Sequence, residues 1–202
     1  MKIKPWMIFA VLAGFVLIGA TAFLVGRLLT PHEFHGAVLQ SPQPAQNFSL
    51  MSHVGQRVAL NDFRGKIVLL YFGYTICPDV CPTTLAELSK TRKMLGKDAD
   101  QIQVLMVTVD PERDTLPVLA DYMTHFHPSF LGLTGTPDEI AQAATPFGVF
   151  YEKETSDSAL GYLVNHTATV MIVDRNGYLR IVFPFGTTAE DIAADLKYLI
   201  QK

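Results

Sequence analysis

The stretch IVLLYFGYTICPDVCP, residues 67–82, decides how this chain folds. Its first six residues, 67–72, are aliphatic or aromatic without interruption, as expected of a strand that is buried on both faces. Gly73 then opens a loop, and residues 82–95 alternate apolar and polar side chains at helical spacing up to Gly96. The stretch therefore predicts a buried strand that leads, through a loop with two cysteines, into a helix.

The segments around this stretch continue the alternation of strands and helices. Strands are predicted at 102–109 and 130–133, hairpins at 47–51 with 57–60 and at 169–173 with 179–183, and helices at 115–126, 137–147 and 189–200. Parallel strand–helix–strand units, closed by a hairpin and a terminal helix, are typical of a thioredoxin-like α/β fold. The first hairpin is then an N-terminal extension of that fold.

Residues 1–30 predict a single transmembrane helix. No charged residue occurs from position 6 to 26, and a helix of that length, rising about 1.5 Å per residue, spans the roughly 30 Å of a bilayer's hydrocarbon. Lys2 and Lys4 precede it, so the positive-inside rule puts the N-terminus in the cytoplasm and the domain in the periplasm. The alternative is a cleaved signal peptide, since residues 20–22 are small, although apolar residues continue beyond them. Both readings predict export.

The remainder divides into a linker and one domain. Residues 31–46 contain three prolines and no apolar period, which predicts a linker, and residues 47–202 form the predicted thioredoxin-like domain. The formal net charge is −3, and no cluster of lysine and arginine follows the predicted anchor. This composition excludes a basic nucleic-acid-binding surface.

Cys77 and Cys81 are the only cysteines, and they lie at the predicted start of a helix, where the helix dipole favours thiolate over thiol. Three residues separate them, so one helical turn places both sulfurs on the same side. Soft thiolates favour Cu(I), and an added imidazole also allows Cu(II). Two alternatives stay open: a structural disulfide, and a redox-active pair without metal in which both cysteines are catalytic in a thiol–disulfide reductase.

His166 is the predicted third ligand among six histidines. It precedes the predicted strand 169–173, and in a thioredoxin-like sheet the loop entering that strand packs beside the cysteine loop. His32 and His35 fall in the predicted linker, and the others lie in the first hairpin or at the end of a helix. The predicted metal site is therefore Cys77, Cys81 and His166.

Several blocks of sequence together resemble the Sco/SenC family of copper-binding assembly factors for cytochrome c oxidase. These blocks are TICPDVCP at 75–82, VDPERDT at 109–115, FHP at 126–128, GLTG at 132–135, FGV at 147–149 and HT at 166–167. The resemblance spans essentially the whole predicted domain. It implies that Cys77, Cys81 and His166 bind copper, and that the partners are oxidase subunit II and a periplasmic copper donor protein.

Two further positions bear on this resemblance. Asn165 stands where many relatives carry aspartate, which puts a role for that carboxylate in doubt. Asp110 either orients the site or caps the segment that begins at Pro111, and capping is the favoured interpretation. No proline lies between residues 160 and 180, where thiol oxidoreductases of this fold place one, and this favours metal binding. A peroxidase is disfavoured because Thr75 has no identifiable arginine companion.

Overall fold

The computed structural model describes residues 14–15, 17–23, 26, 32–155 and 161–202, which belong to two units, Met1–Glu33 and Phe34–Lys202. In the first unit, the described residues between 14 and 26 are helical, and the Thr21 hydroxyl donates to the Leu17 carbonyl at 2.9 Å. Most of the predicted transmembrane segment lies outside the described residues. Within the described part, no helix combines the length and the apolar character that crossing a bilayer requires.

The second unit contains the predicted domain. Its strands are β1 (Ala37–Val38), β2 (Ser49–Ser52), β3 (Arg57–Ala59), β4 (Ile67–Gly73), β5 (Ile102–Thr108), β6 (Leu131–Thr134), β7 (Tyr151–Thr155), β8 (Tyr162–His166), β9 (Val170–Val173) and β10 (Leu179–Phe183). Its α-helices are α2 (Val80–Leu95), α3 (Leu116–Thr124), α4 (Pro137–Ala144) and α5 (Ala189–Ile200), with short 3-10 helices at Leu60–Phe63, Gly96–Gln101 and Thr145–Phe147.

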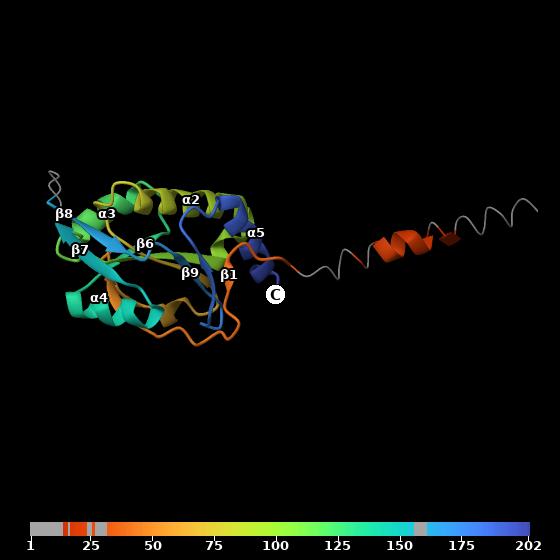
Figure 1. Cartoon of the computed structure of the whole chain (residues 1–202), viewed down its shortest axis with the longest axis horizontal. Coiled ribbons are helices and arrows are strands. Elements are labelled where there is room, and N and C mark those ends of the chain that lie inside the picture. Colours follow the sequence, from red (N-terminus) through yellow and green to blue (C-terminus); the bar gives the residue numbers. More distant parts are fainter. Residues whose placement is uncertain (1–13, 16, 24–25, 27–31, 156–160) are drawn as a thin grey trace, which may run out of the picture. The chain divides into compact units, whose positions relative to one another are not determined.

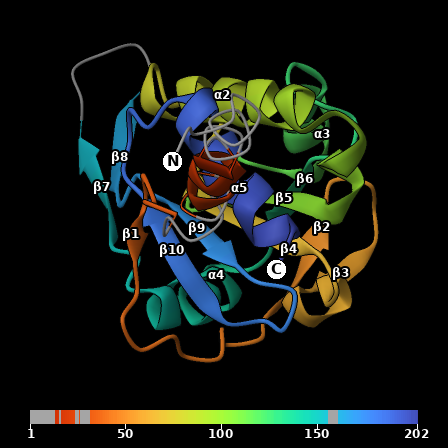
Figure 2. The ribbon, with the colours of Figure 1, turned by 90° about the vertical axis from the view of Figure 1, so that its right-hand side faces the viewer.

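Eight strands form one mixed sheet in the order β1-β10-β9-β4-β5-β6-β2-β3. β4 pairs with β5, and β5 with β6, in parallel, as strand–helix–strand connections require. The other neighbours are antiparallel, including the predicted hairpins β2–β3 and β9–β10. Figure 2 shows β1, β10, β9 and β4 side by side. The predicted α/β architecture with an N-terminal hairpin is therefore present.

Helices cover both faces of this sheet. α2, α3 and α5 lie on one side and α4 lies on the other (Figure 1). α2 and α5 also contact each other, since the Glu87 carboxylate accepts a hydrogen bond from the Ala189 N–H at 2.9 Å. Between the two helical layers, all seven residues of β4 are buried. The end of β4 is therefore a fixed point from which the cysteine loop departs.

β7 and β8 form a separate two-stranded antiparallel sheet, in which Tyr151 lies opposite His166. The sequence did not predict these strands. β7 reads YEKET, and four of its five residues are exposed, so it shows neither an apolar run nor an apolar alternation. His166 is consequently the last residue of a strand, whereas the prediction placed it in a loop before residue 169.

The compact unit begins earlier than predicted. Part of the predicted linker 31–46 belongs to the domain, because β1 pairs with β10 at the edge of the large sheet. The Phe34 ring also packs edge-on against Tyr198 of α5, with 5.3 Å between the ring centroids. A two-residue edge strand among prolines leaves no periodic pattern in the sequence, which explains the missed boundary.

The predicted helix 137–147 is shorter in the structure. α4 ends at Ala144 and a 3-10 turn, Thr145–Phe147, follows it. Pro146 lacks a backbone N–H and its ring obstructs the preceding turn, so the α-helix stops before it. At its start, Thr136 and Glu139 form the reciprocal hydrogen bonds of a capping box.

Candidate metal centre

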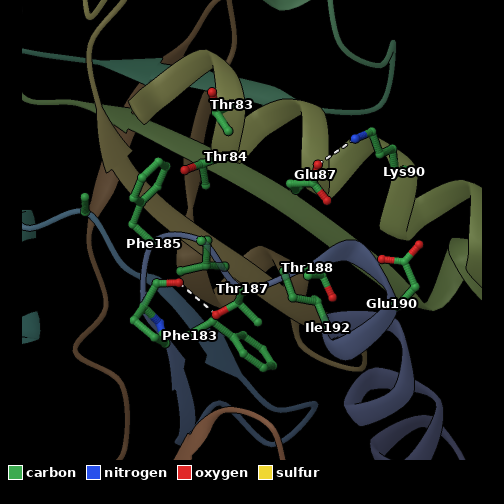
Figure 3. A pocket seen from close by; sticks show the side chains of 14 residues that line it. Thr83, Thr84, Glu87, Lys90, Phe183, Phe185, Thr187, Thr188, Glu190 and Ile192 are labelled. Atoms are coloured by element: carbon green, nitrogen blue, oxygen red, sulfur yellow. Dashed lines mark hydrogen bonds and ion pairs between the residues drawn. The ribbon is translucent and has the colours of Figure 1, made fainter. Parts of the chain in front are cut away.

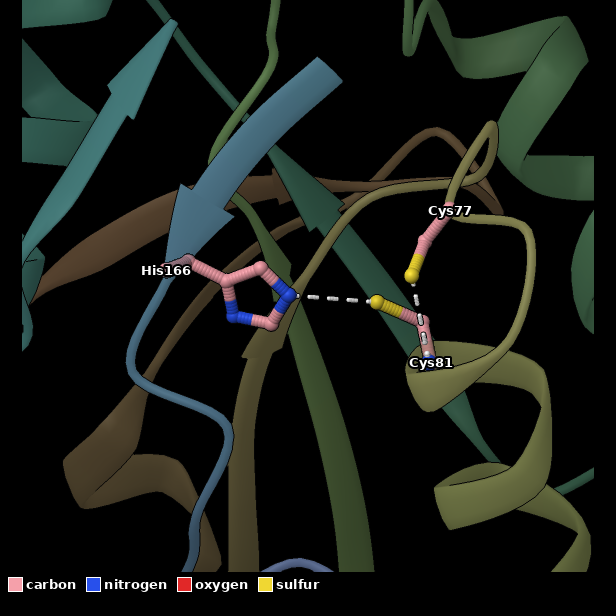
Figure 4. Close-up of side chains that lie close together, drawn as sticks. All are labelled: Cys77, Cys81 and His166. Carbon is pink, nitrogen blue, oxygen red and sulfur yellow. Dashed lines mark hydrogen bonds between the residues drawn. The ribbon is translucent and has the colours of Figure 1, made fainter. Parts of the chain in front are cut away.

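Three side chains that the sequence analysis selected converge beyond the carboxyl end of the central strand β4. Cys77 comes from the loop after β4, Cys81 from the first turn of α2 and His166 from the end of β8 (Figure 4). His166 Nε2 lies 3.4 Å from Cys81 Sγ. One donor atom from each residue lies within 4.8 Å of the others, and the described residues contain no second group of three or more such ligands. The three atoms are close enough to share one metal ion.

Cys81 is held in place by the buried end of β4. Cys81 is fully buried, and its backbone N–H donates to Cys77 Sγ at 3.4 Å. Gly73 makes this approach possible, because a Cβ there would lie 2.6 Å from the Tyr71 ring and 3.0 Å from Cys81 Sγ. A larger residue at position 73 would therefore displace the sulfur. The sheet and α2 together fix one ligand tightly.

The cysteine loop is tied to the next strand by a buried carboxylate. Asp114 is fully buried and accepts hydrogen bonds from the Thr75 N–H at 3.1 Å, the Thr75 hydroxyl at 2.6 Å and the Thr108 hydroxyl at 2.6 Å. Burial raises the pKa of Asp114, and these hydrogen bonds oppose that rise. Asp114 therefore joins the start of the loop to the end of β5.

The His166 ring is oriented with one nitrogen toward the sulfurs. His166 Nδ1 lies 3.2 Å from the carbonyl oxygen of Thr167, which can only accept a hydrogen bond. The proton of a neutral ring is therefore assigned to Nδ1, and the Nε2 lone pair faces Cys81. The rings of Tyr74 and Tyr71 pack edge-on against the imidazole, with centroids 5.8 Å and 6.2 Å away. This is the tautomer that a metal ion needs at Nε2.

β8, which carries His166, is fastened to the cysteine side of the site. Its Val164 N–H donates to the Tyr74 hydroxyl oxygen at 3.2 Å. At its other end, the Tyr162 hydroxyl donates to the buried Asp110 carboxylate at 2.8 Å, while Arg113 lies over the Tyr162 ring at 3.6 Å and pairs with Asp110. These contacts hold the small sheet against the loop that follows β5.

The two sulfurs differ in charge. Hydrogen bonding to Cys81, followed by contacts with His166 and the backbone N–H of Asp79, lowers the pKa of Cys77 to about 3. The bond to Cys77 and burial raise the pKa of Cys81. The first deprotonation of the pair is therefore favoured at half-buried Cys77 over buried Cys81.

The site opens into a cleft of about 210 Å³. Its walls come from the cysteine loop, the start of α2, and β8 with the residues after it, and include Tyr74, Cys77, Asp79, Asn165, His166 and Ala168. Ala168 also lines a larger hollow of about 350 Å³ between α2 and the start of α5, where Glu87 and Lys90 pair on one wall (Figure 3). No cysteine, histidine or methionine is among the described residues that line this second hollow. Of these two hollows, the smaller cleft is therefore the one whose walls include the sulfur and imidazole ligands that a soft metal ion prefers.

The remaining predicted positions have other roles. Asp110 has a structural role, which is the kind of role that the sequence analysis favoured for it. Its side chain binds Arg113 and Tyr162, however, and does not cap the segment at Pro111. The capping prediction is therefore wrong in its detail, because the carboxylate is turned into the protein toward those two partners. Asn165 is exposed and donates to Glu154 at 2.7 Å.

Three of the other histidines have side-chain partners elsewhere in the described domain. His53 Nδ1 accepts from the Gly132 N–H at 3.1 Å, and His127 Nδ1 lies 2.9 Å from the Ser129 hydroxyl. His35 contacts Asp195 of α5 at 3.1 Å. Among the histidines of the described residues, His166 alone joins the cysteine cluster.

Sequence reasoning missed the residues that support the site. Asp114 and Tyr162 were missed because Thr75 and Asp110, to which they bond, are distant in sequence and because β8 was not predicted. Arg113 was missed although its partner Asp110 is only three residues away. Asp114 could have been suspected from its place beyond a predicted buried strand, where an acidic side chain requires hydrogen-bond donors. Tyr162 offered no such clue.

Comparisons with known proteins identify the family to which this chain is similar. The family model described as SCO1/SenC matches residues 37–201. The chain is 35% identical over 163 residues to the mouse protein named "Protein SCO2 homolog, mitochondrial", covering 80% of this chain and 64% of the mouse protein. It is 34% identical over 187 residues to an SCO2-like protein of Rickettsia conorii, covering 89% and 91% of the two chains. The chain thus spans a little over three fifths of the mouse relative's length.

Solved structures with similar folds include copper-bound and metal-free proteins. ScoI of Bradyrhizobium japonicum with copper bound superposes with a TM-score of 0.72 at 39% identity, over 78% of this chain and 99% of that one. Apo Sco1 of Thermus thermophilus gives a TM-score of 0.75 at 43% identity, over 83% and 98%. The mixed α/β fold described above is therefore the fold of these proteins.

Proposed function

The chain belongs to the SCO1/SenC family, and on that premise we propose that it binds one copper ion and serves as an assembly factor for cytochrome c oxidase. The observation that carries the proposal is the cluster of Cys77 Sγ, Cys81 Sγ and His166 Nε2, whose donor atoms lie within 4.8 Å of one another. The copper-bound state of the similar Bradyrhizobium protein supports the choice of metal.

The donor set fits copper in both oxidation states. Two thiolates and one imidazole make a soft, low-coordinate site for Cu(I), and the open cleft leaves room for a further oxygen ligand that Cu(II) prefers. Cys77, Cys81 and His166 would hold the ion. The Nδ1 contact with the Thr167 carbonyl would keep the imidazole available, as hydrogen bonds to metal-binding histidines generally do.

Copper then passes to subunit II of the oxidase, where a dinuclear copper centre is completed. Cys77 is the more exposed of the two sulfurs, so the incoming ligands of the partner reach the ion from its side. Cys81 and His166 would be replaced after it, one bond at a time. A periplasmic protein that presents Cu(I) on few ligands is the matching donor.

A thiol–disulfide reductase is the second candidate, and the low pKa of Cys77 favours it. The Cys77 thiolate would attack a partner disulfide to form a mixed disulfide. Cys81 would then displace the partner, which leaves a Cys77–Cys81 disulfide and the partner with two thiols. Two electrons move from this pair of cysteines to the partner in each turnover.

One titration separates the two candidates. The reduced full chain, in detergent, is mixed with one equivalent of Cu(I) or Cu(II), and bound metal is measured after competition with a chelator. The copper function predicts one ion per chain held far more tightly than millimolar. Millimolar binding together with rapid reduction of oxidised subunit II would instead support the reductase.

We also propose that residues 1–30 anchor the chain in the inner membrane with the domain in the periplasm. The uncharged stretch 6–26 and the lysines before it support this orientation. Fusing a reporter enzyme that is active only after export behind Lys202 tests it. Reporter activity in the membrane fraction is expected. Activity released from the membrane would indicate that the N-terminal segment is cleaved, and an inactive reporter would indicate the opposite orientation.

A further inference from the structure

Two buried tyrosine hydroxyls near the cysteine pair have no hydrogen-bond partner among the described residues, those of Tyr71 and Tyr122. Leaving a buried hydroxyl unpaired costs about 1–3 kcal/mol, so such groups usually acquire a partner in some state of the protein. The Tyr71 side chain is completely buried in β4. A partner for Tyr71 must therefore come from the interior of the molecule.

Tyr71 packs against both sides of the metal site. Its ring lies edge-on to the His166 imidazole, with centroids 6.2 Å apart. A Cβ on Gly73 would lie 2.6 Å from the Tyr71 ring and 3.0 Å from Cys81 Sγ, so the ring and the sulfur are close to each other. The phenol thus packs beside both the imidazole and the buried sulfur, which contact each other, and it is exposed to neither solvent nor the open cleft.

Two groups are near enough to interact with the Tyr71 hydroxyl, Thr84 and Cys81, and either could accept its hydrogen bond. The Thr84 hydroxyl, one turn of α2 after Cys81, donates to the Val80 carbonyl at 2.8 Å and leaves its own oxygen as an acceptor. Cys81 is the other acceptor, and it becomes a charged one when it binds a metal, because the thiolate is the ligand form. Hydrogen bonds to ionised acceptors are roughly twice as strong as those to neutral ones. Once copper is bound, the Tyr71 hydroxyl is therefore expected to donate to the charged Cys81 sulfur and not to the Thr84 hydroxyl.

We propose that Tyr71 is a positioning residue of the metal site, whose hydroxyl donates a hydrogen bond to the Cys81 sulfur when copper is bound. This inference rests on the proposed copper function. A donor aimed at a coordinated sulfur withdraws electron density from it, which favours the lower oxidation state. Tyr71 therefore shifts the preference of the site toward Cu(I), the state that a soft, easily exchanged site holds best.

The test uses Tyr71→Phe in the full chain, with Tyr122→Phe as the matched control. The control also loses a buried, unpartnered hydroxyl, but the Tyr122 ring contacts Phe126, with centroids 5.1 Å apart. Dissociation constants for Cu(I) and Cu(II) are measured by chelator competition, together with the sulfur-to-Cu(II) absorption band. Tyr71→Phe is expected to change the ratio of the two constants about tenfold in favour of Cu(II) and to move the band to longer wavelength. Tyr122→Phe is expected to change neither.

Equal ratios and identical bands in the wild type and Tyr71→Phe would overturn the inference, and so would equal shifts in both variants. If Tyr71→Phe does not fold, a crystal structure of the copper-loaded wild type decides: the hydroxyl within hydrogen-bonding distance of Cys81 Sγ supports the inference, and the hydroxyl on Thr84 refutes it. A wild type that binds no copper would instead refute the proposed function, so the two failures are distinguishable.

Discussion

The two sides of the metal site are built on unlike supports. Cys81 lies in the first turn of α2, next to the end of β4, whose seven residues are all buried, and the loop before Cys81 is bound by the buried Asp114. His166 ends a two-stranded sheet in which four of the five residues of β7 are exposed. One side is fixed by the core and the other by a few polar contacts at the periphery. The difference implies that the cysteine side sets whether copper binds, and the histidine side sets how it is held and released.

Removing ligands from the two sides should have unequal effects, and this is the largest contrast expected. Cys81→Ser removes a soft ligand from the rigid side and should weaken binding of Cu(I) by more than about a hundredfold. His166→Ala should weaken Cu(II) more than Cu(I), because two thiolates satisfy the softer ion. Chelator competition on both variants measures this. If Cys81→Ser and His166→Ala lost Cu(I) affinity equally, the cysteine side and the histidine side of the site would not have the different roles described here.

Asp114→Ala tests the rigid side through stability. The substitution leaves two hydroxyls and one N–H of Thr75 and Thr108 without their acceptor, and it should lower the free energy of unfolding by about 3 kcal/mol. Asp121→Ala, at an exposed position of α3, is the control and should change stability by less than about 0.5 kcal/mol. Denaturant unfolding gives both values. Similar values for the two variants would show that Asp114 does not secure the loop.

Tyr162→Phe tests the peripheral side. Loss of its hydroxyl removes the hydrogen bond to Asp110 and should cost about 1 kcal/mol, while the ring still stacks under Arg113. Because this contact fastens β8, we expect a measurable loss of Cu(II) affinity with little change for Cu(I). Tyr178→Phe, at an exposed residue between β9 and β10, serves as the control. Unchanged Cu(II) affinity in Tyr162→Phe would mean that β8 is positioned without this bond.

The smallest expected effect is a change in stability on substitution of His35, which lies at the start of the domain and is distant in sequence from the metal site. Hydrogen bonding to Asp195, with added attraction from Asp191, raises the pKa of His35. His35 therefore stabilises the fold fully at pH values below the pKa that it has in the unfolded chain. This stabilisation is lost as the pH rises through the higher pKa that His35 has in the folded protein. The difference in unfolding temperature between wild type and His35→Ala should shrink from about pH 5.5 to pH 8. His125→Ala, at another exposed histidine, is the control, and a difference that grows with pH would contradict the pairing.

The same contrast explains what could be predicted from the sequence. β4, α2 and β5 were predicted because a buried apolar run and a helix ending at Gly96 are local signals. β7 was missed because its charged residues show no periodicity, β8 because its apolar run at 162–164 is only three residues long, and β1 because it is only two residues long. The proximity of Cys77 and Cys81 was predicted from their spacing and position, and the structure places both beside His166. The contacts of Tyr162 with Asp110 and of Asp114 with Thr75 join distant segments and could only be seen in three dimensions.

The proposed copper ligands are Cys77 Sγ, Cys81 Sγ and His166 Nε2, and X-ray absorption at the copper edge identifies the ligand atoms directly. In the full chain loaded with one equivalent of Cu(I), we predict two sulfur scatterers and one imidazole nitrogen around the metal, with the imidazole signal absent in His166→Ala. A copper shell without the imidazole in the wild type, or one that His166→Ala leaves unchanged, would contradict the proposed site.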